Sequence, residues 1–184
     1  METSTALFSP TPLETAPEGS REALTNVQRA FGMIPNLMAT FAHSPAVLNG
    51  YLALDAAYNT THFSPVERQV ILLAASLEND CTYCKAAHST ILKGMLKVDA
   101  EVVAAIRNGQ ALADPKHDAL VTTVREVVRA RGHLTNATRD AFLAAGYEPV
   151  HLMELLLGVA LKTISNYLDH FSATPLDPAF APEA

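Results

Sequence analysis

The only two cysteines of the chain lie together in the stretch LENDCTYCKAAHS, which covers residues 77–89. Two residues separate Cys81 from Cys84, and His88 follows four positions after the second cysteine. Thiols and an imidazole at this spacing can bind a metal ion, form a structural disulfide or carry out reversible redox chemistry. The choice among the three depends on the element that carries these residues and on the rest of the sequence.

The residues before the first cysteine predict a helix start. Asn79 and Asp80 are both favoured at helix N-termini, so we expect Cys81 in the first turn of a helix. At about 100° per residue, Cys81, Cys84 and His88 then share one helix face. The partial positive charge of the helix N-terminus stabilises a thiolate, and a nearby imidazole can accept the proton that leaves. The pattern favours a redox dithiol.

The alternatives to redox chemistry are weaker for the same residues. Zinc takes four ligands, and the two thiols with His88 offer only three, so a fourth ligand would have to come from another helix or subunit. A disulfide across two intervening residues closes a very short loop and restricts the unfolded chain little. Buried cysteines can be mere apolar residues, but these two directly follow a helix cap. We expect neither a metal nor an organic cofactor, since the chain also lacks a Gly-rich phosphate loop.

The composition is that of a globular protein with an excess of acidic residues. Of 184 residues, 49% are hydrophobic and 17% are charged, with a net charge of −6 at pH 7. Nucleic-acid binding is not expected, because the basic residues are scattered along the chain. The N-terminus has no signal-peptide pattern, and the longest apolar run contains Glu154 and Lys162 and is too short to cross a bilayer. We expect a cytoplasmic protein without membrane contact.

The elements that position the dithiol are predicted to be helices throughout. Apolar residues recur with a period of three to four, between breaks at Pro, Gly and capping residues. Ser44 and Ser64 each precede a proline at the first helical position, and Glu67 completes a capping box with Ser64. The fold class is therefore all-α, a single-domain bundle of about eight helices.

The two ends of the chain are expected to differ from the helical domain. The helical domain is predicted over residues 20–171, with an irregular Pro-rich arm over 1–19 and an extended tail over 172–184. Within the domain, helices are expected to end at glycines, namely Gly32, Gly94, Gly109, Gly132 and Gly146.

The segment ERQVILLAASLENDCTYCKAAHS resembles the alkylhydroperoxidase D-like branch of the carboxymuconolactone decarboxylase superfamily, whose signature is a glutamate followed by C-x-x-C-x-x-x-H. The stretches FGMIPNLMATFAHSPAVLNGYLAL, RGHLTNATRDAFLAAGYEP and NYLDHFSATPLDPAF are similar to a peroxidase-related subgroup of that family. The resemblance covers residues 31–180. It implies an all-helical subunit assembled as a trimer or hexamer, with a dithiol that reduces a hydroperoxide and is recharged by a thiol or lipoyl-type donor.

The resemblance also implies a role for each residue of the motif. Cys84 attacks the peroxide oxygen and becomes a sulfenic acid, Cys81 resolves it to a disulfide, and His88 belongs to a proton relay. The residues themselves leave the attacking thiol open. Cys81 lies nearer the helix N-terminus, which favours it as the more acidic thiol, whereas the imidazole at i+4 favours Cys84.

The chain departs from the family pattern in its relay. The position of the family's glutamate is occupied by Gln69, and a carboxamide cannot carry a proton. Where the best-known member has a relay histidine between the cysteines, this chain has Tyr83. Glu67 and Glu78 are the nearest ionisable substitutes. We interpret Glu78 as the replacement, because Glu67 already has a capping role.

The sequence therefore predicts an enzyme, a thiol-dependent peroxidase-like oxidoreductase of antioxidant defence. Its catalytic residues are predicted to be Cys81, Cys84, His88 and Glu78. Two alternatives remain: lactone decarboxylation, which needs no dithiol, and a non-enzymatic redox sensor whose disulfide switches partner binding. The run LMELLLGVAL is apolar on nearly every side and favours burial against another subunit, so a homo-oligomer is expected.

Overall fold

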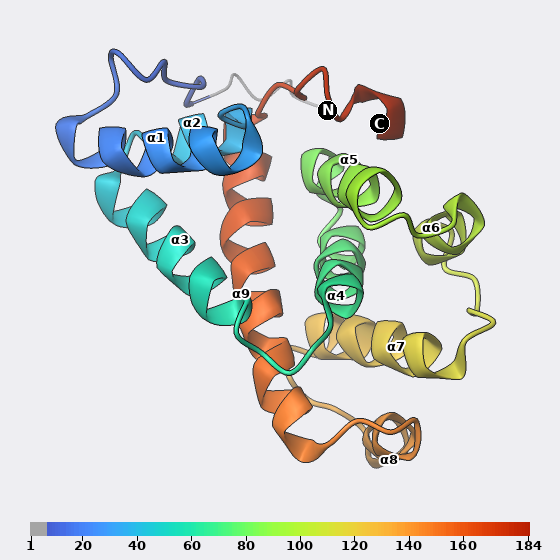
Figure 1. The fold of residues 1–184 in the computed structure, drawn as a ribbon. Helices are drawn as coiled ribbons and strands as arrows, with labels where there is room; N and C mark the ends of the chain where they lie inside the picture. Colours follow the sequence, from blue (N-terminus) through green and yellow to red (C-terminus); the bar gives the residue numbers. More distant parts are fainter. Residues whose placement is uncertain (1–6) are drawn as a thin grey trace.

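The computed structural model describes residues 7–184, so the first part of the predicted N-terminal arm lies outside the described residues. The all-α prediction is confirmed: the described residues form nine α-helices, a π-helical turn η1 and a 3-10 turn η2, and none of them is in a strand (Figure 1). In chain order the elements are α1 (Glu18–Phe31), α2 (Asn36–Phe41), α3 (Pro45–Tyr58), α4 (Pro65–Glu78), α5 (Thr82–Thr90), η1 (Ile91–Met95), α6 (Ala100–Arg107), α7 (Pro115–Arg129), α8 (Asn136–Ala144), α9 (Pro149–Ser172) and η2 (Ala181–Glu183).

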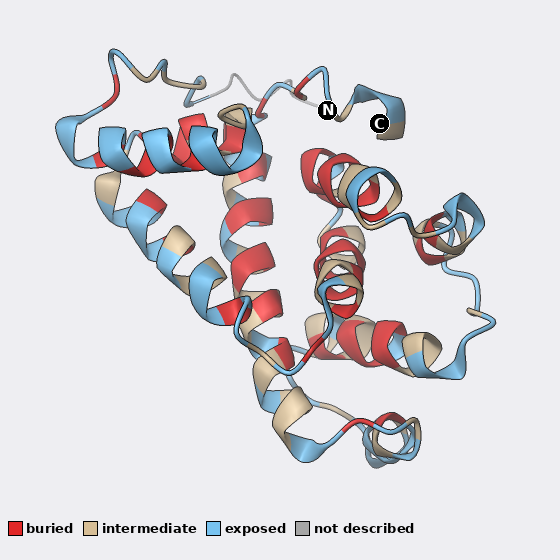
Figure 2. Cartoon of the chain, viewed as in Figure 1, coloured by how far each residue is buried: buried red, intermediate tan, exposed pale blue. Residues whose placement is uncertain are grey.

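The longest helix, α9, has 24 residues and forms the axis around which the others are arranged (Figure 1). It packs against α3 on one side and α4 on the other, and α4 also packs against α5 and α7. Buried residues concentrate on α4, α5, α7 and the inner face of α9 (Figure 2). The core thus lies where α4 and α9 meet, and the dithiol helix α5 is attached to it through both.

A close crossing sets the depth of α9 in this core. At Gly158, an added Cβ would lie 2.8 Å from Ile71 Cγ2 of α4 and 2.9 Å from the hydroxyl oxygen of Tyr58 of α3. Only a residue without a side chain lets the three helices approach this closely. One turn further along the same face, α9 carries Lys162, which is therefore held deep inside the molecule.

The predicted starts of α3 and α4 are confirmed, and one predicted helix end is wrong. Ser44 caps α3 by accepting from a backbone N–H, and Ser64 with Glu67 forms the capping box of α4. Four of the five glycines follow helix ends with positive φ, namely Gly32, Gly109, Gly132 and Gly146. Gly94 does not end the dithiol helix, because α5 stops at Thr90 and Gly94 lies inside the π-helical turn η1.

Glu67 does more than cap α4. Its carboxylate accepts from the Ser64 backbone N at 2.8 Å and from the Tyr147 hydroxyl at 2.9 Å, and Lys116 Nζ lies 3.1 Å away. Burial opposes the charged form, but the hydrogen bonds from Ser64, Tyr147 and Lys116 outweigh it and lower the pKa of Glu67 to about 2. The ionised carboxylate therefore stabilises the fold.

We expect Glu67→Gln to lower the free energy of unfolding by about 2 kcal/mol at neutral pH. Because the folded-state pKa lies below the ordinary value of 4.5, this contribution is present above that value and is lost as pH falls toward about 2. Urea denaturation at pH 7 and at pH 3 measures it, with Glu101→Gln on exposed α6 as the control. An equal loss at both pH values would assign the effect to packing instead of charge.

The C-terminal tail returns across the start of α5. The Tyr83 hydroxyl donates to the Asp177 carboxylate, and the ring of Phe180 stands edge-on to that of Tyr83 with centroids 5.8 Å apart. Further along, Arg107 Nη1 donates to the Glu183 carbonyl at 2.9 Å. The tail is thus fastened to α5 at Tyr83 and to α6 at Arg107.

Within residues 7–184, no helix taken singly has the length and apolar character that crossing a membrane requires. The pair α8 and α9 meets those criteria only when the two are counted together, across a bend of 110°.

Candidate functional site

The dithiol lies at the start of α5 in the interior of the molecule. Cys81 and Cys84 are 0% and 1% exposed, and both are free thiols. The sequence placed Cys81 in the first turn, but it is the N-cap itself: its Sγ accepts from the Cys84 backbone N at 3.3 Å. Asp80, which was expected to share the capping role, has a left-handed φ of 54° and turns the chain from α4 into α5.

Cys81 faces an acceptor on α9. Its thiol donates to Asp169 Oδ2 at 3.3 Å, and Asp169 Oδ1 accepts from the Thr174 backbone N at 3.2 Å. The hydrogen bond with Cys84, burial and the Asp169 carboxylate all raise the pKa of Cys81. Cys81 is therefore a neutral thiol at physiological pH.

The environment of Cys84 lowers its pKa, in contrast to that of Cys81. The neighbouring Cys81 thiol, whose single hydrogen can point to Cys84 instead of Asp169, lowers the pKa of Cys84 most; burial opposes this, and the Lys162 ammonium and the Ser165 hydroxyl lower the pKa further, to about 6. Its Sγ lies 3.9 Å from Ser165 Oγ. A thiol with this pKa is mostly thiolate at pH 7, and thiolate is the nucleophilic form. The geometry thus separates the two thiols into an acidic Cys84 and a neutral Cys81.

His88 is held between two polar side chains from other helices. Its Nδ1 donates to Gln69 Oε1 of α4 at 2.9 Å, and its Nε2 accepts from Lys162 Nζ of α9 at 2.8 Å. Burial first, and then the charge of Lys162, hold the pKa of His88 well below its usual value. The imidazole is therefore neutral, with its hydrogen on Nδ1.

One face of α9 completes the site, and sequence reasoning missed it. Lys162, Ser165, Asn166 and Asp169 are all buried and recur at helical spacing. Asn166 accepts from Asn79 Nδ2 at 3.0 Å and so ties α9 to the turn before α5. The signal in the sequence was this polar pattern within an otherwise apolar helix.

The structure brings together Cys81, Cys84 and His88 but does not bring Glu78 to them. Glu78 ends α4, and its carboxylate pairs with Arg129 and Arg125 of α7, with Oε1 3.0 Å from Arg129 Nη2. The interpretation of Glu78 as a relay carboxylate therefore needs correction, because its acceptor oxygens are taken up by two guanidinium groups.

Glu67, the other ionisable substitute, is equally remote from the relay. Its carboxylate is bonded to Ser64 and Tyr147, so no carboxylate of the described residues bonds to His88. Metal binding gains no support either, since residues 7–184 contain no group of three or more His, Cys, Asp or Glu arranged to hold an ion.

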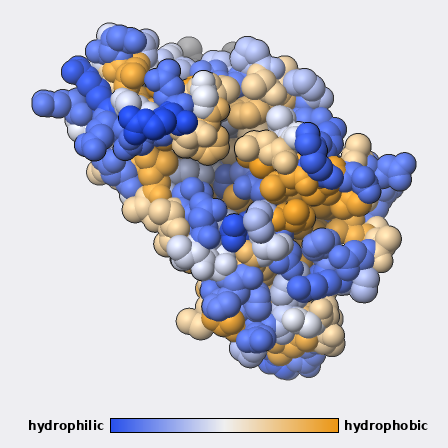
Figure 3. Space-filling model, in the orientation of Figure 1, coloured by the Kyte–Doolittle hydropathy of each residue, from blue (hydrophilic) through white to orange (hydrophobic). Residues whose placement is uncertain are grey.

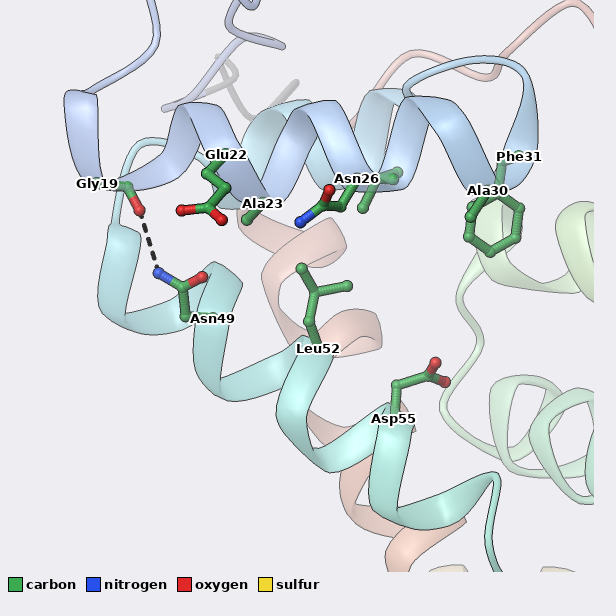
Figure 4. A pocket seen from close by; sticks show the side chains of 10 residues that line it. Gly19, Glu22, Ala23, Asn26, Ala30, Phe31, Asn49, Leu52 and Asp55 are labelled. Atoms are coloured by element: carbon green, nitrogen blue, oxygen red, sulfur yellow. Dashed lines mark hydrogen bonds between the residues drawn. The ribbon is translucent and has the colours of Figure 1, made fainter.

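A cavity of about 570 Å³ opens between α1 and α3 (Figure 4). Glu22 and Asn26 of α1 face Leu52 and Asp55 of α3 across it. Tyr51, next to Leu52 in sequence, is buried beside Lys162, Cys84 and Ser165. Tyr51 therefore belongs to the thiol site, whereas its neighbour Leu52 lines the cavity.

An all-helical bundle with a buried C-x-x-C pair and a histidine one turn later defines a class of helical dithiol proteins. The model of the carboxymuconolactone decarboxylase family matches residues 45–121, which contain both cysteines and His88. The match covers less than half of the chain, and it agrees with the resemblance to this superfamily that the sequence predicted. No significant match was found among curated proteins.

Solved structures show the same fold. A peroxidase-related protein from Ralstonia eutropha JMP134, described as an alkylhydroperoxidase AhpD core, is 23% identical over 96% of each chain, with a TM-score of 0.83. A peroxidase-related protein from Silicibacter sp. TM1040 is 20% identical over 97% of this chain and 95% of its own, with a TM-score of 0.81. The debrominase Bmp8 is 18% identical over 97% of this chain and 96% of its own, also at 0.81. These structures, all below 25% identity, show that the chain shares their fold over nearly its whole length.

Proposed function

We propose that the protein is a dithiol peroxidase that reduces a small hydroperoxide, with Cys84 as the attacking thiolate and Cys81 as the resolving thiol. The observation that carries this proposal is the difference between the two thiols: Cys84 is acidic beside Lys162, and Cys81 is a neutral donor to Asp169. A peroxidatic pair needs one thiolate to attack and one thiol to wait for the oxidised product.

The proposed reaction has two steps. The Cys84 thiolate attacks one oxygen of the hydroperoxide, the O–O bond breaks, and the other oxygen takes up a proton and leaves as the alcohol. Cys81 sulfur then attacks the Cys84 sulfenic acid, the S–S bond forms, and its proton leaves with the hydroxyl group as water. One hydroperoxide and two thiols become one alcohol, one water and one disulfide.

An external thiol or lipoyl-type dithiol is proposed to recharge the pair. The donor must reach a disulfide that lies just beneath the surface. Asp80, the neighbour of Cys81, has a side chain that is 90% exposed, so the chain beside the resolving cysteine is open to solvent. Attack by a donor thiolate on Cys81 then releases Cys84 as the leaving thiol, which a low pKa favours.

The test is consumption of hydrogen peroxide and of tert-butyl hydroperoxide by the reduced protein. Without a donor, we expect loss of both free thiols in each chain and recovery on treatment with dithiothreitol. With dihydrolipoamide as donor, turnover should continue. Thiols that stay free in excess peroxide would contradict the proposal.

A second candidate is reductive dehalogenation. The debrominase Bmp8 shares this fold, and a cysteine-to-alanine variant of that protein has been solved in complex with 2,3,4-tribromopyrrole, at 16% identity to this chain. Here the Cys84 thiolate would take the bromine from carbon, a proton would replace it, and Cys81 would displace bromide as the disulfide forms. Bromide release from the tribromopyrrole by the reduced protein distinguishes this reaction from peroxide reduction.

Two further alternatives, a lactone decarboxylase and a redox sensor, can be distinguished from a peroxidase by activity measurements. Lactone decarboxylation uses no dithiol, so a Cys84→Ser protein would still decarboxylate a carboxymuconolactone. A redox sensor would form the disulfide once but would not turn over with any donor.

The protein is also proposed to be a homo-oligomer built through α9. Five large apolar side chains on that helix are 40–72% exposed and follow one another at spacings close to the helical period, namely Met153, Leu156, Ile164, Tyr167 and Phe171. We call them the α9 stripe. A continuous exposed apolar row of this kind is typical of a subunit contact, and the trimers or hexamers implied by the family resemblance provide the partner. Further apolar surface is visible on the side formed by α4, α5 and α6 (Figure 3).

A further inference from the structure

We propose that Lys162 takes over the proton relay of the site: it holds the proton given up by Cys84 and returns it to the leaving oxygen. This inference rests on the proposed peroxidase function and names the group that would make the relay work without a carboxylate.

Lys162 is buried without a carboxylate partner. It is 2% exposed, its Nζ donates to His88 Nε2, and none of the ion pairs found in residues 7–184 includes it. An isolated buried ammonium is costly unless an anion lies nearby. Burial lowers the pKa of Lys162, but its interactions with Tyr51, Cys84 and Cys81 outweigh burial and raise the pKa. Of these three groups, Cys84 is the one that ionises near neutral pH.

The hydrogen bonds of His88 exclude it as the primary proton source. Its Nδ1 hydrogen is bonded to Gln69 Oε1, and its Nε2 lone pair is occupied by the Lys162 ammonium. A neutral imidazole bound in this way has no proton to give at Nε2. It can only orient Lys162, so His88 acts here as a positioning residue.

Gln69 explains why the relay is cationic. A glutamate at this position would place a negative charge against His88 Nδ1 and would accept the thiol proton through the imidazole. The neutral carboxamide cannot do so, and the charge in the network of Gln69, His88 and Lys162 is positive instead of negative. A positive network stabilises the Cys84 thiolate before reaction and the developing alkoxide during it.

The proton balance closes within the site. Proton transfer from the Cys84 thiol to the neutral Lys162 amine gives the thiolate–ammonium pair. When the thiolate attacks the hydroperoxide and the O–O bond breaks, the ammonium protonates the alkoxide and becomes an amine again. Reduction of the disulfide restores the Cys84 thiol, and its proton recharges Lys162 for the next cycle.

The other titratable groups around Lys162 do not reverse this assignment. From α3, Tyr51 and Asp55 face it; from α5, Cys81 and His88; and Asp169 lies further along α9. Burial raises the pKa of Tyr51, and the hydrogen bond with Cys84 raises the pKa of Cys81, so both are neutral when Cys84 ionises. Asp169 raises the pKa of Cys84, which makes a counteracting cation more necessary.

The decisive experiment measures the pKa of Cys84 by the pH dependence of its alkylation with iodoacetamide, followed by mass spectrometry. In Lys162→Met we expect this pKa to rise from about 6 to about 7.5, part of the way to the ordinary thiol value, so that alkylation at pH 7 slows roughly fourfold. The control is Lys85→Met on the same helix as the cysteines, because Lys85 pairs with exposed Asp80 and lies outside the site. A Cys84 pKa that stays near 6 in Lys162→Met would overturn the proposal.

Lys162→Arg separates charge from proton transfer. Arginine keeps the positive charge but does not release a proton, so alkylation at pH 7 should stay near the wild-type rate. Oxidation of Cys84 by peroxide should slow by about 10²-fold, the usual contribution of a positioned acid. An equal peroxide rate in wild type and Lys162→Arg would refute the proton-donor role.

A measurement on the wild-type protein covers the case in which both variants fail to fold. Histidine ¹⁵N NMR should show His88 neutral from pH 5 to pH 8 with its hydrogen on Nδ1. A His88 that becomes an imidazolium in this range would overturn the proposal, because Lys162 could not then be donating to it. The thiol pKa and the histidine tautomer can be measured without turnover. A protein that fails to reduce any peroxide would therefore refute the proposed function, whereas the role of Lys162 would still be decided by these two measurements.

Discussion

Replacing Cys84 by serine is expected to abolish peroxide reduction, whereas Cys81→Ser leaves one oxidation per chain. Cys84 is the acidic thiol beside Lys162 and Ser165, and a serine hydroxyl is not ionised at any working pH. Loss of the nucleophile should lower the rate of peroxide consumption by at least about 10³-fold. In Cys81→Ser the attack still takes place, but the sulfenic acid has no resolving thiol, so turnover stops there.

Peroxide consumption in a single turnover and trapping of the sulfenic acid with dimedone, read by mass spectrometry, distinguish these outcomes. Thr82→Ser, an exposed change between the same two cysteines, is the matched control and should behave as wild type. A dimedone adduct on Cys81 in the Cys84→Ser protein, with none on Cys84 in Cys81→Ser, would reverse the two roles.

The second large effect is expected in the assembly. Leu156 and Tyr167 of the α9 stripe are each 51% exposed, and replacing both by glutamate should convert the oligomer into a chain of 19.7 kDa. A carboxylate buried in an apolar subunit contact without a partner costs several kcal/mol per subunit. Light scattering at micromolar concentration measures the mass, which should fall by a factor of three or six.

The control for the double variant places a glutamate at an exposed site away from α9. Ala137 on α8 is exposed, and Ala137→Glu should leave the mass unchanged. A wild-type mass near 19.7 kDa would show that the α9 stripe does not hold copies together.

Most of the fold could be predicted because its signals are local. Ser44 and Ser64 can be recognised as helix starts, because each is a capping residue followed by a proline. The capping residue, the proline and the backbone N–H that is capped all lie within four residues of sequence. The C-x-x-C pair and His88 could be grouped for the same reason, since a helix brings residues at these spacings onto one face. The prediction that the helix ends at Gly94 was wrong because a π-helical turn includes this glycine. Its hydrogen bonds join residues five apart instead of four, and the amino-acid composition does not predict such a turn.

The relay could not be predicted because its members are far apart in sequence. Lys162 meets His88 across 74 positions, and Gln69 meets it across 19. Glu78, by contrast, lies three residues before Cys81, and its proximity in sequence suggested a role that its two arginine partners exclude. Which side chain of α9 enters the site is decided by the close crossing at Gly158, a packing property that no local pattern encodes.

The N-cap role of Cys81 has an electrochemical consequence. In the reduced protein its sulfur accepts from the Cys84 backbone N and donates to Asp169, and the thiolate of Cys84 is stabilised as well. A disulfide sulfur has no hydrogen to donate, so the bond to Asp169 exists only in the reduced state. Interactions confined to the reduced state raise the reduction potential, by about 30 mV for each 1.4 kcal/mol.

A pair poised in this way gives up part of its driving force toward the oxidant and becomes easier to re-reduce. Peroxides are such strong oxidants that they still oxidise the pair when its reduction potential is raised. Reduction of the disulfide, in contrast, depends on donors whose potentials lie close to those of protein disulfides. The same hydrogen that Cys81 donates to Asp169 thus sets how weak a reductant can still return the protein to its working state.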